Sequence, residues 1–374
     1  MMKKLICMVL VLCLLSGCAA TPVAPKEPVT PTPVYDEAPI KNEKTVTFDG
    51  KFFEVLAKGE NEYVRLSALA EAFGGTVNMQ TDNAAPYTCT FSADGKLYSL
   101  ATDSDLLIYG ENDVELGYAP LFDGKEWYLP CRFLPIGPDY HVFEDGNVTY
   151  YTAYPDQMPD GVRLPILMYH AVGDDPWGIA SLFVRPSELE KQLQYLQKEG
   201  YTTITFEDVD RLDEIEKPIM LTFDDGYEDN YSQLFPLLKK YNAKATVFVI
   251  TGSIGTTHYL TNEQIKEMSD SGLVSIQSHT VSHPFLSDLG EEELEKELLG
   301  SKQALAKITG KEPFVICYPT GKSSALSRQV CEKYYSFGLL MNGGTFTTNG
   351  DNFRITRSYV SRSTDIYSYA SLCD

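Results

Sequence analysis

The chain has 374 residues, enough for two domains, and 43% of them are hydrophobic while 22% are charged. This balance supports a buried core and excludes a chain that is disordered throughout. Acidic residues outnumber basic ones by 52 to 31, which gives a formal net charge of −21. The charge argues against a nucleic-acid partner, because too few cations are present to neutralise a run of phosphates.

The first 17 residues have the features of an export signal. Lys3 and Lys4 precede an apolar run, Leu5 to Leu15, that is too short to span a bilayer as a permanent helix. The run ends in Leu15-Ser16-Gly17-Cys18, which resembles the lipobox of bacterial lipoproteins. The resemblance implies that residues 1–17 are removed and that lipid on Cys18 anchors the protein to the outer face of the bacterial cytoplasmic membrane. The alternative is an ordinary signal peptide with a chance cysteine.

The next two segments differ in composition. Residues 18–44 hold Cys18 and a proline-rich run that favours extended conformations, so we expect a tether. From residue 45 to residue 153, short alternating strands predominate, with a hairpin signal at Asp49-Gly50. This segment resembles the copper amine oxidase N-terminal-like stalk domain, although its single histidine, His141, gives no reason to expect copper. We expect a small α+β spacer that can contact the cell wall.

Five cysteines remain beyond Cys18, and they form no zinc-knuckle pattern. Because export permits disulfides, Cys89 and Cys131 can pair, but the sequence leaves the connectivity open.

Apolar runs alternate with amphipathic helices from residue 160 to the end of the chain, residue 374. One predicted helix, Ser187 to Glu199, has Ser187 and Glu190 at capping-box spacing. The alternation predicts a parallel sheet, open or closed into a barrel, with any chemistry at the C-terminal ends of its strands. The predicted strands include Leu164 to Tyr169, Pro218 to Phe223, Ala243 to Ile250, Val274 to Gln277 and Phe314 to Tyr318.

Two of these predicted strands run into candidate metal ligands. Asp224 and Asp225 follow one strand, where two adjacent carboxylates are costly unless a cation compensates them; the alternative is an exposed turn. His279 and His283 follow another, and two histidines four apart can converge on one ion if the segment is helical or tightly turned. Asp225, His279 and His283 together suit Zn²⁺ or a similar divalent ion, with positions left for water and substrate. Two surface histidines are the alternative.

A third predicted strand ends in Cys317-Tyr318-Pro319-Thr320-Gly321, a sharp loop whose backbone N–H can face the site or simply make a turn. Thr222–Gly226, His279–His283 and Tyr318–Gly321, in this order, resemble the NodB-homology polysaccharide deacetylases of carbohydrate esterase family 4. The opening Leu167–His170 resembles the subgroup whose catalytic histidine has moved to the front of the domain. The resemblance implies an α/β fold, a distorted (β/α) barrel of about seven strands, preceded here by the small α+β stalk-like domain.

The resemblance also implies roles for individual residues. Asp224 would be the general base and His170 the general acid, the alternative for His170 being a buried core histidine. Asp225, His279 and His283 would hold a divalent metal, with Zn²⁺ the expected ion. The backbone N–H of Tyr318 would help to bind the oxyanion, and Arg357, which matches a late arginine of the subgroup, would orient Asp224. The third motif departs from the family, because it lacks an arginine and has Thr320 where an aromatic residue is usual.

The expected activity is therefore that of a metal-dependent hydrolase acting on carbon–nitrogen bonds other than peptide bonds. It would remove N-acetyl groups from an extracellular or cell-wall polysaccharide of N-acetylglucosamine type and release acetate. The alternatives are an O-acetyl esterase acting on a glycan, and a non-catalytic wall-binding lipoprotein. The expected partners are an acetylated polysaccharide and the membrane, reached through the Cys18 lipid, with no nucleic acid.

Overall fold

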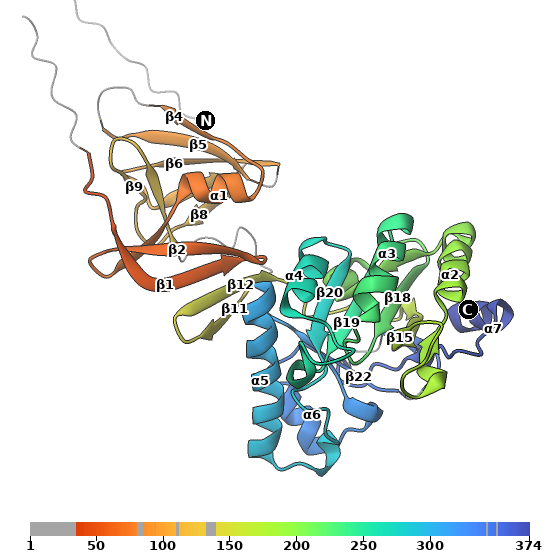
Figure 1. Ribbon diagram of the computed structural model, residues 1–374. Helices are drawn as coiled ribbons and strands as arrows, with labels where there is room; N and C mark the ends of the chain where they lie inside the picture. The colour runs from red at the N-terminus through yellow and green to blue at the C-terminus, as the bar shows by residue number, and fades with distance from the viewer. Residues whose placement is uncertain are drawn as a thin grey trace, which may run out of the picture.

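A computed structural model describes residues 35–80, 85–93, 95–109, 112–131, 140–341, 343–348 and 351–374 (Figure 1). The expected signal peptide (residues 1–17) and the lipidation site Cys18 lie outside the described residues. In the described part of the chain, no helix combines the length and the apolar character needed to cross a bilayer.

The N-terminal region, residues 35–153, is built mainly of antiparallel strands around one short helix, α1 (Leu66–Ala72). A seven-stranded sheet has the order β11-β12-β1-β2-β3-β10-β9, and β4 to β8 form a five-stranded meander. The strands are β1 (Ile40–Phe48), β2 (Lys51–Lys58), β3 (Asn61–Arg65), β4 (Val77–Gln80), β5 (Thr88–Ala93), β6 (Lys96–Ala101), β7 (Leu106–Tyr109), β8 (Asn112–Glu115), β9 (Leu121–Phe122), β10 (Trp127–Pro130), β11 (Tyr140–Asp145) and β12 (Val148–Ala153). Strand β12 returns beside β1 and runs parallel to it.

The first hairpin forms where the sequence predicts it, but its first strand begins earlier than expected. Asp49 and Gly50 both have positive φ, 44° and 87°, as a tight hairpin turn requires. Strand β1 begins at Ile40, which pairs with Ala57, so residues 40–44 belong to the sheet and not to the tether. The polar residues of this stretch do not show the alternation expected of a strand. The strand forms through backbone pairing, with an irregular register between Lys41 and Thr45.

The C-terminal region, residues 160–374, contains an eight-stranded sheet in which every pairing is parallel. The order is β22-β21-β20-β19-β18-β14-β24, with β17 also paired to β18, so the sheet has one strand more than the expected seven. An isolated parallel bridge joins Leu339, the last residue of β22, to Ile355, which precedes β24 in the chain. The strands are β14 (Ile166–Tyr169), β17 (Thr202–Ile204), β18 (Pro218–Phe223), β19 (Ala245–Val249), β20 (Val274–Ser278), β21 (Val315–Cys317), β22 (Phe337–Leu339) and β24 (Ser358–Tyr359).

Helices alternate with these strands, which makes the region an α/β fold (Figure 1). Helix α2 begins at Pro186 rather than at a Ser187 cap, because proline fits the first helical position without losing a hydrogen bond. The helices are α2 (Pro186–Glu199), α3 (Phe235–Tyr241), α4 (Asn262–Asp270), α5 (Glu291–Thr309), α6 (Ala325–Cys331) and α7 (Ile366–Cys373). Short two-stranded pairings join β13 (Arg163–Leu164) to β23 (Phe346–Thr347) and β15 (Ala171–Val172) to β16 (Phe183–Val184).

The strands of the eight-stranded sheet bury both faces, and their alternation decides which side chains reach the site. In β18, Ile219, Leu221 and Phe223 join the core that packs against α2, α3 and α4. Met220 belongs to the core on the opposite, inner face. Since side chains alternate along a strand, the inner face is also where the next even-numbered residue after β18, Asp224, is directed.

The N-terminal region contacts the C-terminal region at the start of β21, the end of that strand remote from the site described below. The backbone N–H of Glu312 donates a 2.7 Å hydrogen bond to the Thr152 hydroxyl. The ring of Tyr154, the residue after this region, stacks on Phe314 with ring centroids 4.2 Å apart. The five cysteines of the described residues are all buried and free, so Cys89 and Cys131 do not pair.

Candidate active site

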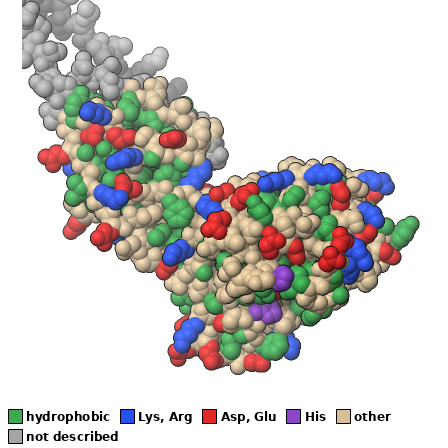
Figure 2. Space-filling model, viewed as in Figure 1, with side chains coloured by type: hydrophobic (Ala, Val, Ile, Leu, Met, Phe, Trp, Pro, Cys, Tyr) green, Lys and Arg blue, Asp and Glu red, His purple; other side chains and the backbone are tan. Residues whose placement is uncertain are grey.

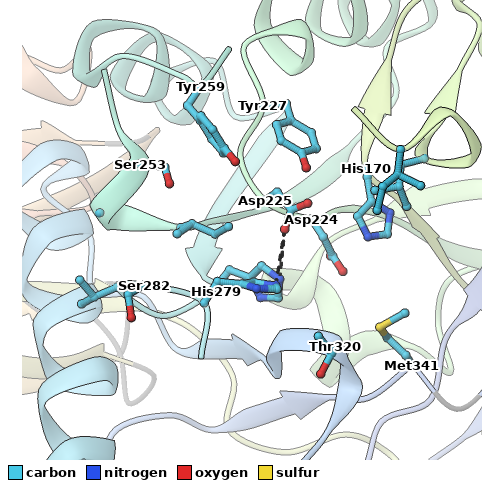
Figure 3. A pocket seen from close by; sticks show the side chains of 16 residues that line it. His170, Asp224, Asp225, Tyr227, Ser253, Tyr259, His279, Ser282, Thr320 and Met341 are labelled. Carbon is cyan, nitrogen blue, oxygen red and sulfur yellow. Dashed lines mark ion pairs between the residues drawn. The ribbon is translucent and has the colours of Figure 1, made fainter. Parts of the chain in front are cut away.

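A cavity of about 750 Å³ lies at the C-terminal ends of β14, β18, β20 and β21 (Figure 3). It contains polar residues that follow each of these four strands in the sequence. Histidine side chains reach the surface of the C-terminal region in the view of Figure 2. The cavity is lined by His170, Ile179, Leu182, Asp224, Asp225, Tyr227, Ile250, Gly252, Ser253, Tyr259, His279, Val281, Ser282, His283, Thr320 and Met341.

Asp224 is buried at the base of the cavity and is paired with Arg357. The two residues form two charge-assisted hydrogen bonds, Nη1 to Oδ1 and Nη2 to Oδ2, each 2.7 Å long. Burial favours the protonated acid, but the guanidinium of Arg357 outweighs it and holds the pKa of Asp224 well below its usual range. Asp224 is therefore a carboxylate at neutral pH.

Arg357 is itself fully buried and has a partner for each of its nitrogens. Its Nε donates to the Leu340 carbonyl at 3.1 Å, and Nη1 also donates to the Thr222 hydroxyl at 3.0 Å. Nη2 lies 2.9 Å from the Cys317 sulfur. These contacts hold the guanidinium in one plane. The structure places Arg357 beside Asp224, the residue that the family resemblance implied it would orient.

Asp225, His279 and His283 converge on one point of the cavity wall. Asp225 Oδ1 lies 3.5 Å from His279 Nε2 and 3.7 Å from His283 Nε2. His279 Nδ1 faces the Cys317 carbonyl at 2.8 Å, so this nitrogen carries the proton and Nε2 presents its lone pair to the group. Ligands of a tetrahedral ion with bonds of about 2.05 Å are roughly 3.3 Å apart. One carboxylate and two imidazoles at these separations fit a divalent cation.

A second group, Asp224, His279 and Cys317, is equally compact but fits a cation poorly. Burial raises the pKa of the Cys317 thiol well above its usual value, and the thiolate is the form that binds metal. Both carboxylate oxygens of Asp224 are already bonded to Arg357. The donor set of Asp225, His279 and His283 is therefore the one available to an ion.

His170 lies directly opposite Asp224 across two paired strands. Strands β14 and β18 pair Tyr169 with Phe223, so the next residues along are His170 and Asp224, on the inner face of the sheet. The His170 side chain lines the cavity and is only 8% exposed. Figure 3 shows His170 and His279 on either side of Asp224. Within the described residues, His170 Nδ1 has no hydrogen-bond partner.

The expected role of Tyr318 is wrong. Its backbone N–H donates to the Leu339 carbonyl at 3.0 Å, because Tyr318 continues the parallel ladder between β21 and β22. Its side chain points away from the cavity into the core beside α5 and α6, where the hydroxyl donates to the Phe353 carbonyl at 3.2 Å. An N–H already bonded within a sheet cannot stabilise an oxyanion.

Thr320, two residues later, differs from Tyr318 in the surroundings of its backbone N–H. It lines the cavity and has φ +58°, inside the short turn Pro319–Gly321. Among the described residues, no protein acceptor pairs with its backbone N–H. The sequence contained a signal for this position, since Pro319 and Gly321 bracket the residue at which the loop turns. The conformation at Thr320 itself could not be read from the sequence.

Two tyrosines that the sequence did not single out also line the cavity. Burial and then the charge of Asp225 raise the pKa of Tyr227, so its hydroxyl stays protonated. Tyr259 packs against the Tyr227 ring with centroids 5.2 Å apart. The position of Tyr227, immediately after Asp224-Asp225-Gly226, was the available signal.

Comparisons with known proteins identify a family to which this chain is similar. A family model described as polysaccharide deacetylase matches residues 211–336. YxkH of Bacillus subtilis, whose name places it among the polysaccharide deacetylases, is 36% identical over 205 residues, covering 53% of this chain and 72% of YxkH. A poly-β-1,6-N-acetyl-D-glucosamine N-deacetylase of Staphylococcus epidermidis is 28% identical over 201 residues, covering 49% of this chain and 70% of that protein.

Solved structures extend the likeness. The deacetylase PplD of Streptococcus pyogenes, in complex with acetate, matches with a TM-score of 0.54 and 32% identity, covering 57% of this chain and 99% of its own. A polysaccharide deacetylase of Bacillus cereus matches with a TM-score of 0.55 and 25% identity, and covers 90% of this chain and 98% of its own. The chain therefore belongs to the NodB-type polysaccharide deacetylase family and is an enzyme of that class.

Proposed function

We propose that the protein removes N-acetyl groups from an extracellular polysaccharide of N-acetylglucosamine type, using a divalent ion held by Asp225, His279 and His283. The observation that carries the proposal is the single cavity in which this donor set meets Asp224 and His170. The substrate class is taken from the staphylococcal relative, which acts on poly-β-1,6-N-acetylglucosamine by its name. Zn²⁺ is the expected ion, because imidazole and carboxylate ligands suit it.

An ion at this site would polarise the acetyl carbonyl and lower the pKa of a water molecule. Asp224 takes up a proton as that water attacks, because it is held ionised and its orientation is set by Arg357. The N–H of Thr320 replaces that of Tyr318 as the backbone donor facing the oxyanion, since it is free and lines the cavity. His170, on the other side of Asp224, gives a proton to the departing sugar amine.

The location of His170 supports membership of the subgroup with its acid histidine at the front of the domain. His170 follows β14, the first strand of the parallel sheet, and it lines the same cavity as the metal-ligand set. Apart from the donor set, His170 is the histidine among the residues that line the cavity.

We further propose that Cys18 carries lipid and that the N-terminal region is a stalk-like spacer able to contact the cell wall. Contacts such as Thr152 with Glu312 lie at the end of the sheet remote from the cavity, so the spacer leaves the cavity open to a polymer. The Bacillus cereus structure covers 90% of this chain, which includes much of the same N-terminal region. A Cys18→Ser variant should leave the membrane fraction; continued sedimentation with membranes would contradict the anchor.

A panel of acetylated glycans tests the activity. Purified protein supplied with Zn²⁺ is incubated with poly-β-1,6-N-acetylglucosamine, chitin oligosaccharides and an O-acetylated xylan, and acetate is measured. Acetate release with a matching gain of free amine from an N-acetylated glycan supports the proposal. Release from the xylan alone would make the protein an O-acetyl esterase, and release from none of them would contradict both activities.

A further inference from the structure

The side chain of His170 lacks the support that an acid–base histidine usually has. Such a histidine is normally held by a carboxylate or carbonyl at its second ring nitrogen, which fixes the tautomer and the direction of the ring. Within the described residues, His170 Nδ1 has no such partner, and its ring meets the Tyr359 ring edge-on with centroids 6.1 Å apart. The hydrogen bond that the described residues make to His170 instead reaches its backbone carbonyl.

The backbone around His170 is held by two residues from the segment that follows the metal ligand Asp225. Asn230 Nδ2 donates to the His170 carbonyl at 2.9 Å and to Asp229 Oδ1 at 3.0 Å. The same Asp229 oxygen accepts from the Val172 N–H at 3.0 Å. These three hydrogen bonds, here called the His170 clamp, connect the strand-end segment of the acid to that of the base.

Asn230 is well placed for this task. Its side chain is fully buried, and its N–H donates to the Tyr227 carbonyl at 3.0 Å. It begins a π-helical turn, Asn230–Leu234, a conformation that is rare and frequently found at functional sites. Asp224 is fixed to the same strand as His170, because its N–H donates to the Tyr169 carbonyl at 3.0 Å. Hydrogen bonds therefore fix the backbone of the base, Asp224, and the backbone of the acid, His170, relative to the same pair of strands.

We propose that Asn230 is a positioning residue for the general acid: through the His170 clamp it sets the position from which His170 protonates the leaving amine. This inference rests on the proposed function, since it assigns to His170 the acid role given above. Asn230 touches neither the donor set nor the reacting atoms. It acts through the His170 backbone.

The chemistry requires an amide at this position. The Asn230 side chain faces two acceptors, the His170 carbonyl and an Asp229 oxygen, so its NH₂ and not its oxygen must point toward them. An aspartate of the same shape would present a third oxygen to both acceptors and would repel them. Asn230→Asp therefore opens the clamp with almost no change in volume.

The test compares two substrates of the full-length, Zn²⁺-loaded protein. An N-acetylated oligosaccharide has a poor leaving group that needs a proton, whereas an aryl acetate leaves without one. Asn230→Asp should lower kcat/KM for the oligosaccharide by about 10-fold or more relative to the aryl acetate, because general acid catalysis contributes about 10²- to 10⁴-fold. Metal content should stay at one ion per chain. Asn262→Asp, the same change at an exposed position on α4, should leave the ratio unchanged.

A double-mutant cycle distinguishes positioning from general damage. In a His170→Ala background, Asn230→Asp should alter the substrate ratio by no more than about twofold, because the acid that it positions is already absent. The positioning role would be overturned if Asn230→Asp lowered activity equally on both substrates, or left both activities unchanged, while His170→Ala changed the ratio of the two activities. That result would leave the proposed function standing. An unchanged ratio in His170→Ala would instead remove the acid assignment itself. Should Asn230→Asp fail to fold, Asn230→Ser, with a donor of shorter reach, supplies the same comparison.

Discussion

Asp224 and Arg357 lie 133 positions apart in the chain and are joined by two 2.7 Å hydrogen bonds in the interior of the protein. The pair resolves an electrostatic problem of the site. Two adjacent carboxylates, Asp224 and Asp225, follow a buried strand, and one fixed cation balances the first, so that the second is left for the ion proposed above. Asp224 is consequently ionised and held in one orientation, as a proton acceptor must be.

The role of Asp224 predicts a loss of activity without a loss of metal. Asp224→Asn keeps nearly the same shape and leaves Asp225, His279 and His283 intact. We expect kcat to fall by about 10²-fold or more, the usual scale for a positioned proton acceptor. Acetate release measures the activity, and elemental analysis measures the bound ion. Full activity, or loss of the ion, would show that Asp224 is not the base.

Removing Arg357 should destabilise the fold, because an unpaired carboxylate would remain buried. Arg357→Met should lower the free energy of unfolding by about 3 to 5 kcal/mol, measured by denaturant titration. Asp224→Asn in the same chain should restore part of that loss, since the uncompensated charge is gone. Arg163→Met, at an exposed arginine, serves as the control. Strictly additive losses in the double variant would mean that the two residues are not coupled.

The donor set predicts metal content directly. His279→Ala combined with His283→Ala should abolish binding of one divalent ion per chain, measured by elemental analysis after dialysis. The matched double variant His141→Ala, His258→Ala should keep the ion, because neither residue belongs to the set. If both double variants hold equal amounts of metal, the ion lies elsewhere.

Asp229 predicts a pH dependence of stability. Burial, reinforced slightly by the charge of Glu228, raises the pKa of Asp229 to about 7, from 3.8 in its unperturbed state. The folded chain therefore holds a proton that the unfolded chain releases, and this stabilisation is present at low pH and is lost as the pH rises through about 7. Asp229→Asn resembles the protonated form and cannot lose it.

The free energy of unfolding of Asp229→Asn, relative to wild type, should therefore increase between pH 5 and pH 8. The gain should be on the order of 2 kcal/mol, less than the full pKa shift implies because the carboxyl is partly solvated. Asp213→Asn, at an exposed aspartate, should show a flat difference across the same range. A flat difference for Asp229→Asn as well would mean that its carboxyl is ionised at neutral pH.

Much of the sheet could be predicted from the sequence, because parallel strands are continuous apolar runs. The run Pro218 to Phe223 coincides with β18, and the groups that follow β18 and β20 meet in one cavity as strand order requires. The first residues of strands and helices were harder to predict. Strand β1 begins at Ile40 through backbone pairing, which its polar neighbours do not indicate. Helix α2 begins at Pro186, although the capping-box spacing suggested a start at Ser187.

The proposed oxyanion donor could not be located from the sequence, because the choice between Tyr318 and Thr320 depends on hydrogen bonds made by other residues. The Tyr318 N–H is used by the ladder with β22, a strand whose position is set by long-range pairing. The His170 clamp could not be predicted for the same reason, since Asn230 contacts the His170 carbonyl only once β14 and β18 have paired. Side chains that follow strands are predictable as a group; their individual bonds are not.

The most direct test of the central claim is to remove the ion and then return it. At each stage, acetate release from an N-acetylglucosamine oligomer is measured. Protein treated with a chelator and dialysed should lose activity on the oligomer by about 10²-fold or more while staying folded, and one equivalent of Zn²⁺ should restore it. The restored activity should release acetate and free amine in equal amounts. Undiminished activity in metal-free protein, or metal-loaded protein that releases no acetate, would contradict the account.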